Sequence, residues 1–165
     1  MTRRHPIERV HPPKLLMRLV NPLMRALASR SELVQSFVLV LHYRGRRTGQ
    51  RYDLPVGYRL VDGRILLFTN SEWRHNFRDG REIEVTYRGQ RRPARATLID
   101  EPAIVAALYQ KRFGEMDRRR AQRDLGVRVS LDLPPTRQEW LDLVKREGMS
   151  IVEIALTTTL GAESI

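Results

Sequence analysis

The spacing of apolar residues changes near residue 36, which divides the chain into a helical start and a β-rich middle. Four leucines before that point recur at intervals of three and four: Leu16, Leu19, Leu23 and Leu27. This stripe predicts an amphipathic helix over residues 13–30, which either covers the end of its own sheet or lies on a membrane surface. The basic, proline-containing residues 1–12 predict a flexible arm.

Five runs with a β-like pattern follow, and we interpret each as a strand: residues 36–43, 52–61, 62–68, 82–89 and 90–99. Asp62-Gly63 and Arg88-Gly89 are two-residue hairpin signals. Residues 71–80 predict a short helix after the third strand, and residues 150–158 predict a sixth strand that returns to the sheet. Antiparallel hairpins with short turns favour a small barrel or closed sheet.

Three helices are expected between the fifth strand and the last one: residues 101–113, 117–126 and 134–148. In the third of them Thr136 is the expected N-cap, Glu139 completes a capping box, and Gly148 follows the helix end. No repeat, linker or low-complexity tract interrupts the pattern. We therefore predict an α+β fold with residues 13–165 in a single domain.

The charge of the chain predicts an anionic partner. The 165 residues carry 30 Lys+Arg against 19 Asp+Glu, a formal charge of +11, and nearly all of the excess is arginine. Because arginine binds phosphate and carboxylate groups with a planar fork, a phosphorylated cofactor, nucleic acid or a membrane surface would fit. A GC-rich genome accounts for the arginine excess equally well.

The absence of cysteine excludes disulfides and thiolate chemistry, and it fits a reducing cytoplasm. Arg18 interrupts the early apolar cluster, so no signal peptide is visible. The longest apolar run, residues 37–41, is far too short to cross a bilayer. We expect a cytoplasmic protein, and a contact of residues 13–30 with the inner face of the membrane stays open.

Familiar catalytic motifs are missing, among them HExxH, GxSxG, the Walker loop and GxGxxG. The four histidines show no metal-binding spacing, so no metal site is expected: His5, His11, His42 and His75. No nucleophile has an obvious base, and no catalytic residue is assigned. If the protein is an enzyme, a bound cofactor carries the difficult chemistry.

The turn "GRRTGQ" after the first strand is the first candidate binding element. Gly45 and Gly49 allow the backbone to bend tightly and approach a ligand. Arg46, Arg47 and Thr48 supply donors, and the turn holds no carboxylate. This set suits a phosphate ester, while a solvated basic turn is the alternative.

The segment "TNSEWRHNF" after the third strand is the second candidate. Trp73 and Asn76 lie one helical turn apart and share a helix face. They are either a flat aromatic beside a ligand-binding amide, or an anchoring tryptophan with a capping asparagine.

Taken in order, these motifs resemble a known family. The order is "NPLMR", an apolar strand, "GRRTGQ", Pro55 five residues after Gln50, "DGRILLFT", "WRHNF" and an alternating strand. Over roughly residues 20–100 it is similar to the deazaflavin-dependent nitroreductases and quinone reductases of the split β-barrel flavin-reductase type. The resemblance implies a six-stranded, mostly antiparallel split β-barrel of the FMN-binding type, with an N-terminal helix and C-terminal helices.

The same resemblance implies the deazaflavin coenzyme F420 as cofactor, with its phosphate-bearing tail on the turn. The positions that match cofactor-binding residues of the family are Arg46, Arg47, Thr48, Gly49, Pro55, Asn70, Ser71, Trp73 and Asn76. The implied reaction is hydride transfer to a small-molecule acceptor, a quinone or a nitroaromatic compound. The accompanying proton would come from water or from a tyrosine such as Tyr58 or Tyr109.

This chain departs from the family pattern at several positions. Many members have lysine in place of Arg47, and an arginine where Tyr52 stands; Arg51 lies one step earlier and is expected on the other strand face. The loop "NSE" is also shorter. Flavin mononucleotide (FMN) is therefore the alternative cofactor, and a non-catalytic flavin-, haem- or lipid-binding protein is the alternative function. Nucleic-acid binding through residues 118–123 is disfavoured by the dispersed charge, and a homodimer stays open.

Overall fold

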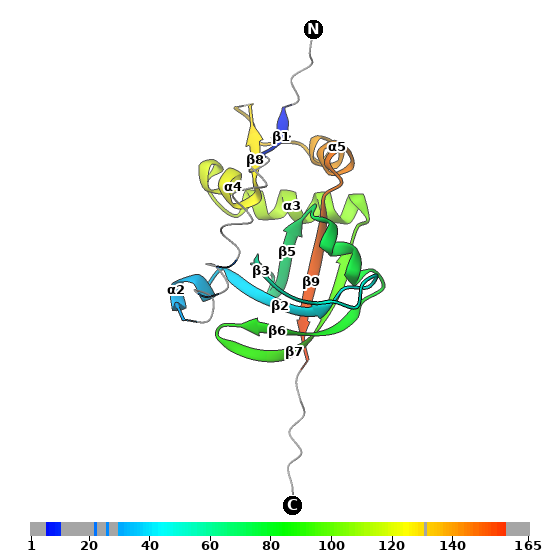
Figure 1. Ribbon diagram of the computed structural model, residues 1–165. Helices are drawn as coiled ribbons and strands as arrows, with labels where there is room; N and C mark the ends of the chain where they lie inside the picture. The colour runs from blue at the N-terminus through cyan, green and yellow to red at the C-terminus, as the bar shows by residue number, and fades with distance from the viewer. Residues whose placement is uncertain (1–5, 11–21, 23–25, 27–29, 131, 158–165) are drawn as a thin grey trace, which may run out of the picture.

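The computed structural model describes residues 6–10, 22, 26, 30–130 and 132–157 (Figure 1). The helix predicted over residues 13–30 lies outside the described residues except for Pro22 and Ala26, which are helical, and Arg30, which lies in a turn. Helices and sheet together form an α+β fold in which a curled antiparallel sheet sits beneath a layer of helices. The predicted fold class is thus confirmed at this level.

The described residues build a seven-stranded sheet in the order β3-β2-β6-β7-β9-β5-β4, with antiparallel pairing throughout. Its strands are β2 Val38–Arg44, β3 Arg51–Gly57, β4 Arg59–Val61, β5 Arg64–Thr69, β6 Arg81–Tyr87, β7 Gln90–Ile99 and β9 Ser150–Leu156. The sheet curls far enough for β3 to contact β5, so it forms a half-barrel (Figure 1).

The predicted count of six strands was wrong because the expected strand over residues 52–61 is divided at Tyr58. The Tyr58 ring is 3% exposed, its hydroxyl donates to the Gln35 carbonyl at 2.9 Å, and its backbone N–H donates to the Phe37 carbonyl at 2.9 Å. These contacts turn the chain, so β3 stays beside β2 while β4 pairs with β5 at the opposite edge of the sheet.

Two hairpin turns formed where the sequence predicted them. Asp62 and Gly63 have φ of 51° and 74°, and Arg88 and Gly89 have φ of 49° and 75°. Two successive positive φ angles are the mark of a type I′ turn, whose twist matches that of the flanking strands. The two turns fix the register of β4 on β5 and of β6 on β7.

Apolar side chains on the two sides of the sheet form two main cores. One fills the half-barrel and includes Leu39, Leu41 and Ile83 from strands β2 and β6. The other lies between the sheet and the helices α3 Pro102–Gly114, α4 Arg118–Leu125 and α5 Arg137–Glu147, with Trp140 fully buried at its centre. Each Å² of apolar surface that is buried contributes about 25 cal/mol of favourable free energy, which holds the sheet and the helices together.

The helix ends follow their predicted signals. Thr136 accepts a hydrogen bond from the Glu139 N–H at 3.3 Å, and the Glu139 carboxylate accepts one from the Thr136 N–H at 2.7 Å, so the capping box is complete. Gly148 follows α5 with φ of 60°, the left-handed conformation that glycine adopts without strain. Helix α2, Glu32–Gln35, precedes the sheet.

The expected flexible arm over residues 1–12 includes a strand that the sequence did not predict. Strand β1, Ile7–Arg9, pairs antiparallel with β8, Val127–Val129, beside the helical layer. Ile7 is 2% exposed and belongs to the helix-side core, which explains why this part of the arm is ordered. Three-residue strands are too short for alternation to reveal them.

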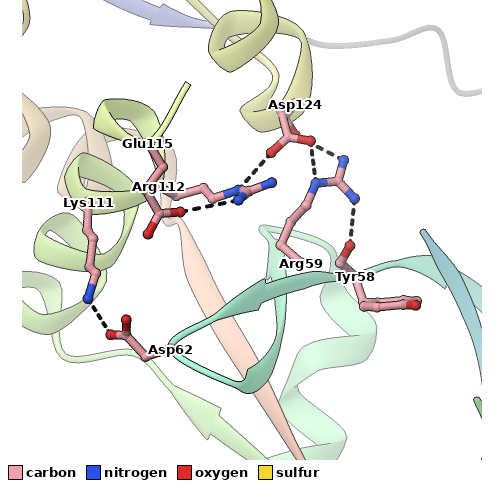
Figure 2. A network of polar contacts seen from close by, with 7 residues as sticks. All are labelled: Tyr58, Arg59, Asp62, Lys111, Arg112, Glu115 and Asp124. Carbon is pink, nitrogen blue, oxygen red and sulfur yellow. Dashed lines mark hydrogen bonds and ion pairs between the residues drawn. The ribbon is translucent and has the colours of Figure 1, made fainter. Parts of the chain in front are cut away.

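A polar network joins the helical layer to the edge of the sheet (Figure 2). The Asp124 carboxylate on α4 accepts from the guanidinium of Arg59 on β4 and, at 3.1 Å, from Arg112 on α3. Arg59 also donates to the Tyr58 carbonyl at 2.7 Å, and Lys111 pairs with Asp62 in the turn between β4 and β5. The side chain of Asp124 is 16% exposed, so this carboxylate holds two half-buried cations.

We predict that Asp124→Ala lowers the free energy of unfolding by about 3 kcal/mol, because it leaves two half-buried guanidinium groups without their shared anion. Urea denaturation followed by Trp140 fluorescence measures the change. Asp142→Ala is the matched control, since Asp142 is an exposed carboxylate on α5 that accepts a hydrogen bond from the neutral Gln138. Equal loss of stability in both variants would contradict the assigned role of the network.

Candidate functional site

The turn between β2 and β3 is closed by two backbone hydrogen bonds. The Gly45 N–H donates to the Gln50 carbonyl at 2.8 Å, and the Gly49 N–H donates to the Gly45 carbonyl at 2.8 Å. Gly49 has φ of 66°, which other residues adopt only with strain. A Cβ on Gly45 would lie 2.7 Å from the Thr48 hydroxyl and 2.9 Å from the Tyr52 ring. Both glycines are therefore required, one for its conformation and one for space.

A short 3₁₀ helix, η1 Glu72–Phe77, follows β5 and lies against this turn. Asn76 on η1 joins the two segments. Its side-chain oxygen accepts from the Arg46 backbone N–H at 2.8 Å, and its side-chain nitrogen donates to the Trp73 carbonyl at 2.8 Å. Phe77 is fully buried in the half-barrel and anchors η1 there, so the basic turn has a fixed position relative to Trp73.

A cavity of about 870 Å³ opens between the turn and η1. We call it cavity 1, and its lining is Tyr43, Gly45, Arg46, Arg47, Thr48, Tyr52, Glu72, Trp73, His75, Asn76 and Arg78. Tyr43 and Tyr52 are stacked with ring centroids 5.4 Å apart, and Tyr43 meets Phe77 edge-on at 5.2 Å. Burial, and then the neighbouring Tyr52, raise the pKa of Tyr43, so its phenol stays neutral. Cavity 1 thus has an aromatic floor.

Guanidinium groups stand at the rim of cavity 1. The Arg46 side chain is 56% exposed and lies 3.9 Å from the Asp79 carboxylate, a loose and solvent-screened pair. Arg47 forms no ion pair with any residue that the structure describes. Arg78 is held by Asp100 at 3.3 Å and by the His75 ring. Arg46 and Arg47 are therefore the two cations that remain available to a ligand.

The structure brings five of the nine predicted site residues to the wall of cavity 1: Arg46, Arg47, Thr48, Trp73 and Asn76. Gly49 shapes the turn without lining the cavity. Pro55 is buried opposite Val40, whose side chain packs with Val34 of α2 outside the half-barrel. Asn70 and Ser71 lie before η1, where their carbonyls accept from Arg74. These last three residues do not line the cavity.

Several lining residues were not singled out from the sequence. Tyr52 faces cavity 1 because it is the cross-strand neighbour of Tyr43, a pairing that depends on the register of β3 on β2. Glu72, His75 and Arg78 reach it because η1 is placed over the end of the sheet. The alternation of strand residues could have indicated Tyr52, but no local signal indicates the other three.

The two tyrosines considered as proton sources are not part of cavity 1. Tyr58 is 3% exposed inside the half-barrel, where burial raises the pKa of its phenol. Tyr109 lies in the helix-side core, and burial raises its pKa to about 12. Neither hydroxyl reaches the cavity, so neither can protonate a ligand there directly.

No group of three or more His, Asp or Glu side chains is arranged to hold a metal ion in the part of the chain that the structure describes. None of the helices described is long and apolar enough to cross a membrane.

Comparison with known proteins gives little beyond this geometry. No family model matches the sequence, and no curated protein is similar to it at a significant level. Among solved structures, the chain is similar to the crystal structure of the conserved hypothetical protein Rv2991 from Mycobacterium tuberculosis. The identity is 14%, the TM-score is 0.41, and the match covers 94% of this chain and 86% of that chain. A likeness at this level carries no argument about the site.

We predict that Asn76→Ala loosens the turn without unfolding the sheet. Loss of the bond to the Arg46 N–H, worth about 1 kcal/mol, should speed amide exchange at Arg46 about fivefold. Hydrogen–deuterium exchange by NMR measures this rate. Asn70→Ala is the matched control, because it removes an amide outside cavity 1. Unchanged exchange at Arg46 in Asn76→Ala would show that Asn76 does not hold the turn.

Proposed function

We propose that the protein is an oxidoreductase that passes a hydride from the reduced deazaflavin coenzyme F420 to a quinone or nitroaromatic acceptor. In this proposal the half-barrel is a split β-barrel of the flavin-reductase type, as the order of the sequence motifs implies. The observation that carries the proposal is cavity 1, in which two available guanidinium groups and an aromatic floor share one space of about 870 Å³.

The residues of cavity 1 fit such a coenzyme. Arg46, Arg47 and Thr48 supply charged and hydroxyl donors for a phosphate group, and the turn from Gly45 to Gln50 contains no carboxylate. Flat aromatic surfaces suit a fused ring system, and a volume of this size lies within the range of small-molecule and cofactor sites. The donors and the floor are joined through Asn76, so a ligand that uses both would bind in one orientation.

The coenzyme, when bound, supplies the hydride. The chain contributes orientation, and holding two reactants in contact geometry is worth about 7–11 kcal/mol of the barrier. Since Tyr58 and Tyr109 lie outside cavity 1, water that enters the cavity is the proton source we propose.

A protein that binds a flavin, haem or lipid anion without turnover is the competing function, with FMN as the competing cofactor. One observation supports FMN as the competing cofactor. Arg51, which stands one position before the arginine of the family pattern, lines a second cavity instead of cavity 1. Cavity 1 therefore has one guanidinium fewer than the resemblance implies. Comparing the affinities for F420 and FMN decides between the two cofactors.

We predict saturable quenching of Trp73 fluorescence by F420, measured in a Trp140→Phe background so that Trp73 is the one remaining tryptophan. Replacing both Arg46 and Arg47 with alanine should weaken binding about 100-fold, because two charge-assisted contacts are lost. The matched control replaces Arg119 and Arg123, two exposed arginines on α4, and changes the net charge equally. Normal binding by the Arg46/Arg47 variant would refute the site, and saturation by FMN alone would refute the cofactor.

Turnover separates the enzyme from the binding protein. With reduced F420 and menadione, we expect recovery of cofactor fluorescence at a rate that rises with protein concentration. The Arg46/Arg47 double alanine variant should lose this activity, whereas the Arg119/Arg123 variant should keep it. Tight binding of F420 without fluorescence recovery for menadione or for a nitroaromatic compound would favour the non-catalytic alternative.

A further inference from the structure

A second cavity, of about 490 Å³, shares Tyr43 and Tyr52 with the lining of cavity 1, and we call it cavity 2. It occupies the place where strands β2 and β6 separate. Their pairing runs from Val40, opposite Thr86, to His42, opposite Glu84, and does not continue to the end of β2. The gap lets side chains from both faces of the sheet reach one space.

Cavity 2 contains three carboxylates, and each already has a side-chain partner on the sheet: Asp53 pairs with the His42 imidazole at 2.7 Å, Glu82 with Arg95 at 2.9 Å and Glu84 with Arg91 at 2.7 Å. Arg91 also lowers the pKa of Glu84 below its usual value, and its hydrogen bond to the carboxylate is the largest cause. The acidic groups of cavity 2 are therefore occupied within the sheet.

Three arginines of cavity 2 have no carboxylate partner among the described residues. Arg44 donates to the Gly49 carbonyl at 3.2 Å and Arg81 donates to the Arg44 carbonyl at 2.7 Å, which fixes both stems without neutralising them. The side chain of Arg51 has no hydrogen-bond or ion-pair partner in the described ranges. Arg44 and Arg51 are also direct cross-strand neighbours, an arrangement in which like charges destabilise a sheet.

We propose that Arg44, Arg51 and Arg81 form a second anion-binding site, which takes an oxyanion of the phosphate class, free or as a small phosphomonoester. Three guanidinium groups drawn from three strands present planar donors that match a tetrahedral oxyanion. The bound anion removes the repulsion between Arg44 and Arg51. A volume of about 490 Å³ has room for an organic group beside the oxyanion. The site is independent of the function proposed for cavity 1.

Arginine Nε–H signals in ¹H–¹⁵N NMR spectra test this assignment. Inorganic phosphate and phenyl phosphate are titrated separately at constant ionic strength. The compound that binds more tightly shows whether the site prefers a free or an esterified oxyanion. We expect saturable shifts of Arg44, Arg51 and Arg81. In Arg51→Gln and in Arg81→Gln the dissociation constant should rise about tenfold or more, since each substitution removes a charge-assisted contact.

Two controls separate this site from cavity 1 and from general screening. Arg119→Gln on α4 makes the same change in net charge and should leave the phosphate affinity unchanged, and so should the double alanine variant at Arg46 and Arg47. As a second readout, phosphate should raise the thermal midpoint of the unaltered protein more than that of Arg51→Gln. Uniform, non-saturating shifts across all arginines would overturn the proposal, as would loss of the site in the Arg46/Arg47 variant.

Discussion

The amide of Asn76 is the contact on which the geometry of cavity 1 depends. Its oxygen holds the backbone of the basic turn and its nitrogen holds the backbone of η1, so one side chain sets the separation of two segments thirty residues apart. The turn could close without it, because Gly45 and Gln50 pair on their own. What Asn76 adds is a fixed relation between the guanidinium groups and the aromatic floor, and orientation of this kind is what hydride transfer requires.

The arrangement of charges explains how a strongly basic chain leaves arginines available at two cavities. On the outer face of the sheet, carboxylates are matched with arginines across strands, as in the pairs of Glu84 with Arg91 and Glu82 with Arg95. Each such pair contributes little to stability in solvent. Because these acids are already paired, the arginines of the two cavities that have no carboxylate partner among the described residues are Arg47, Arg44, Arg51 and Arg81. The composition showed the excess of arginine, whereas its local distribution depends on strand register.

Features encoded by adjacent residues were predictable from the sequence. The turns at Asp62-Gly63 and Arg88-Gly89 and the capping box at Thr136 require a few neighbouring side chains, and the sequence contains them all. The division at Tyr58 depends on contacts with residues more than twenty positions away, and the pairing of β1 with β8 joins segments more than 100 positions apart in the sequence. Five of the nine predicted site residues line cavity 1. The order of the motifs indicates which segments lie near one another, whereas strand register decides which way each side chain faces.

The stacked residues Tyr43 and Tyr52 contribute to the lining of both cavities. A displacement of these two residues would therefore change the shape of both spaces. Thermodynamic linkage then makes the effect reciprocal: the factor by which occupancy of one space changes affinity in the other is the same in either direction. Coupling through these two side chains would require no movement of the sheet itself.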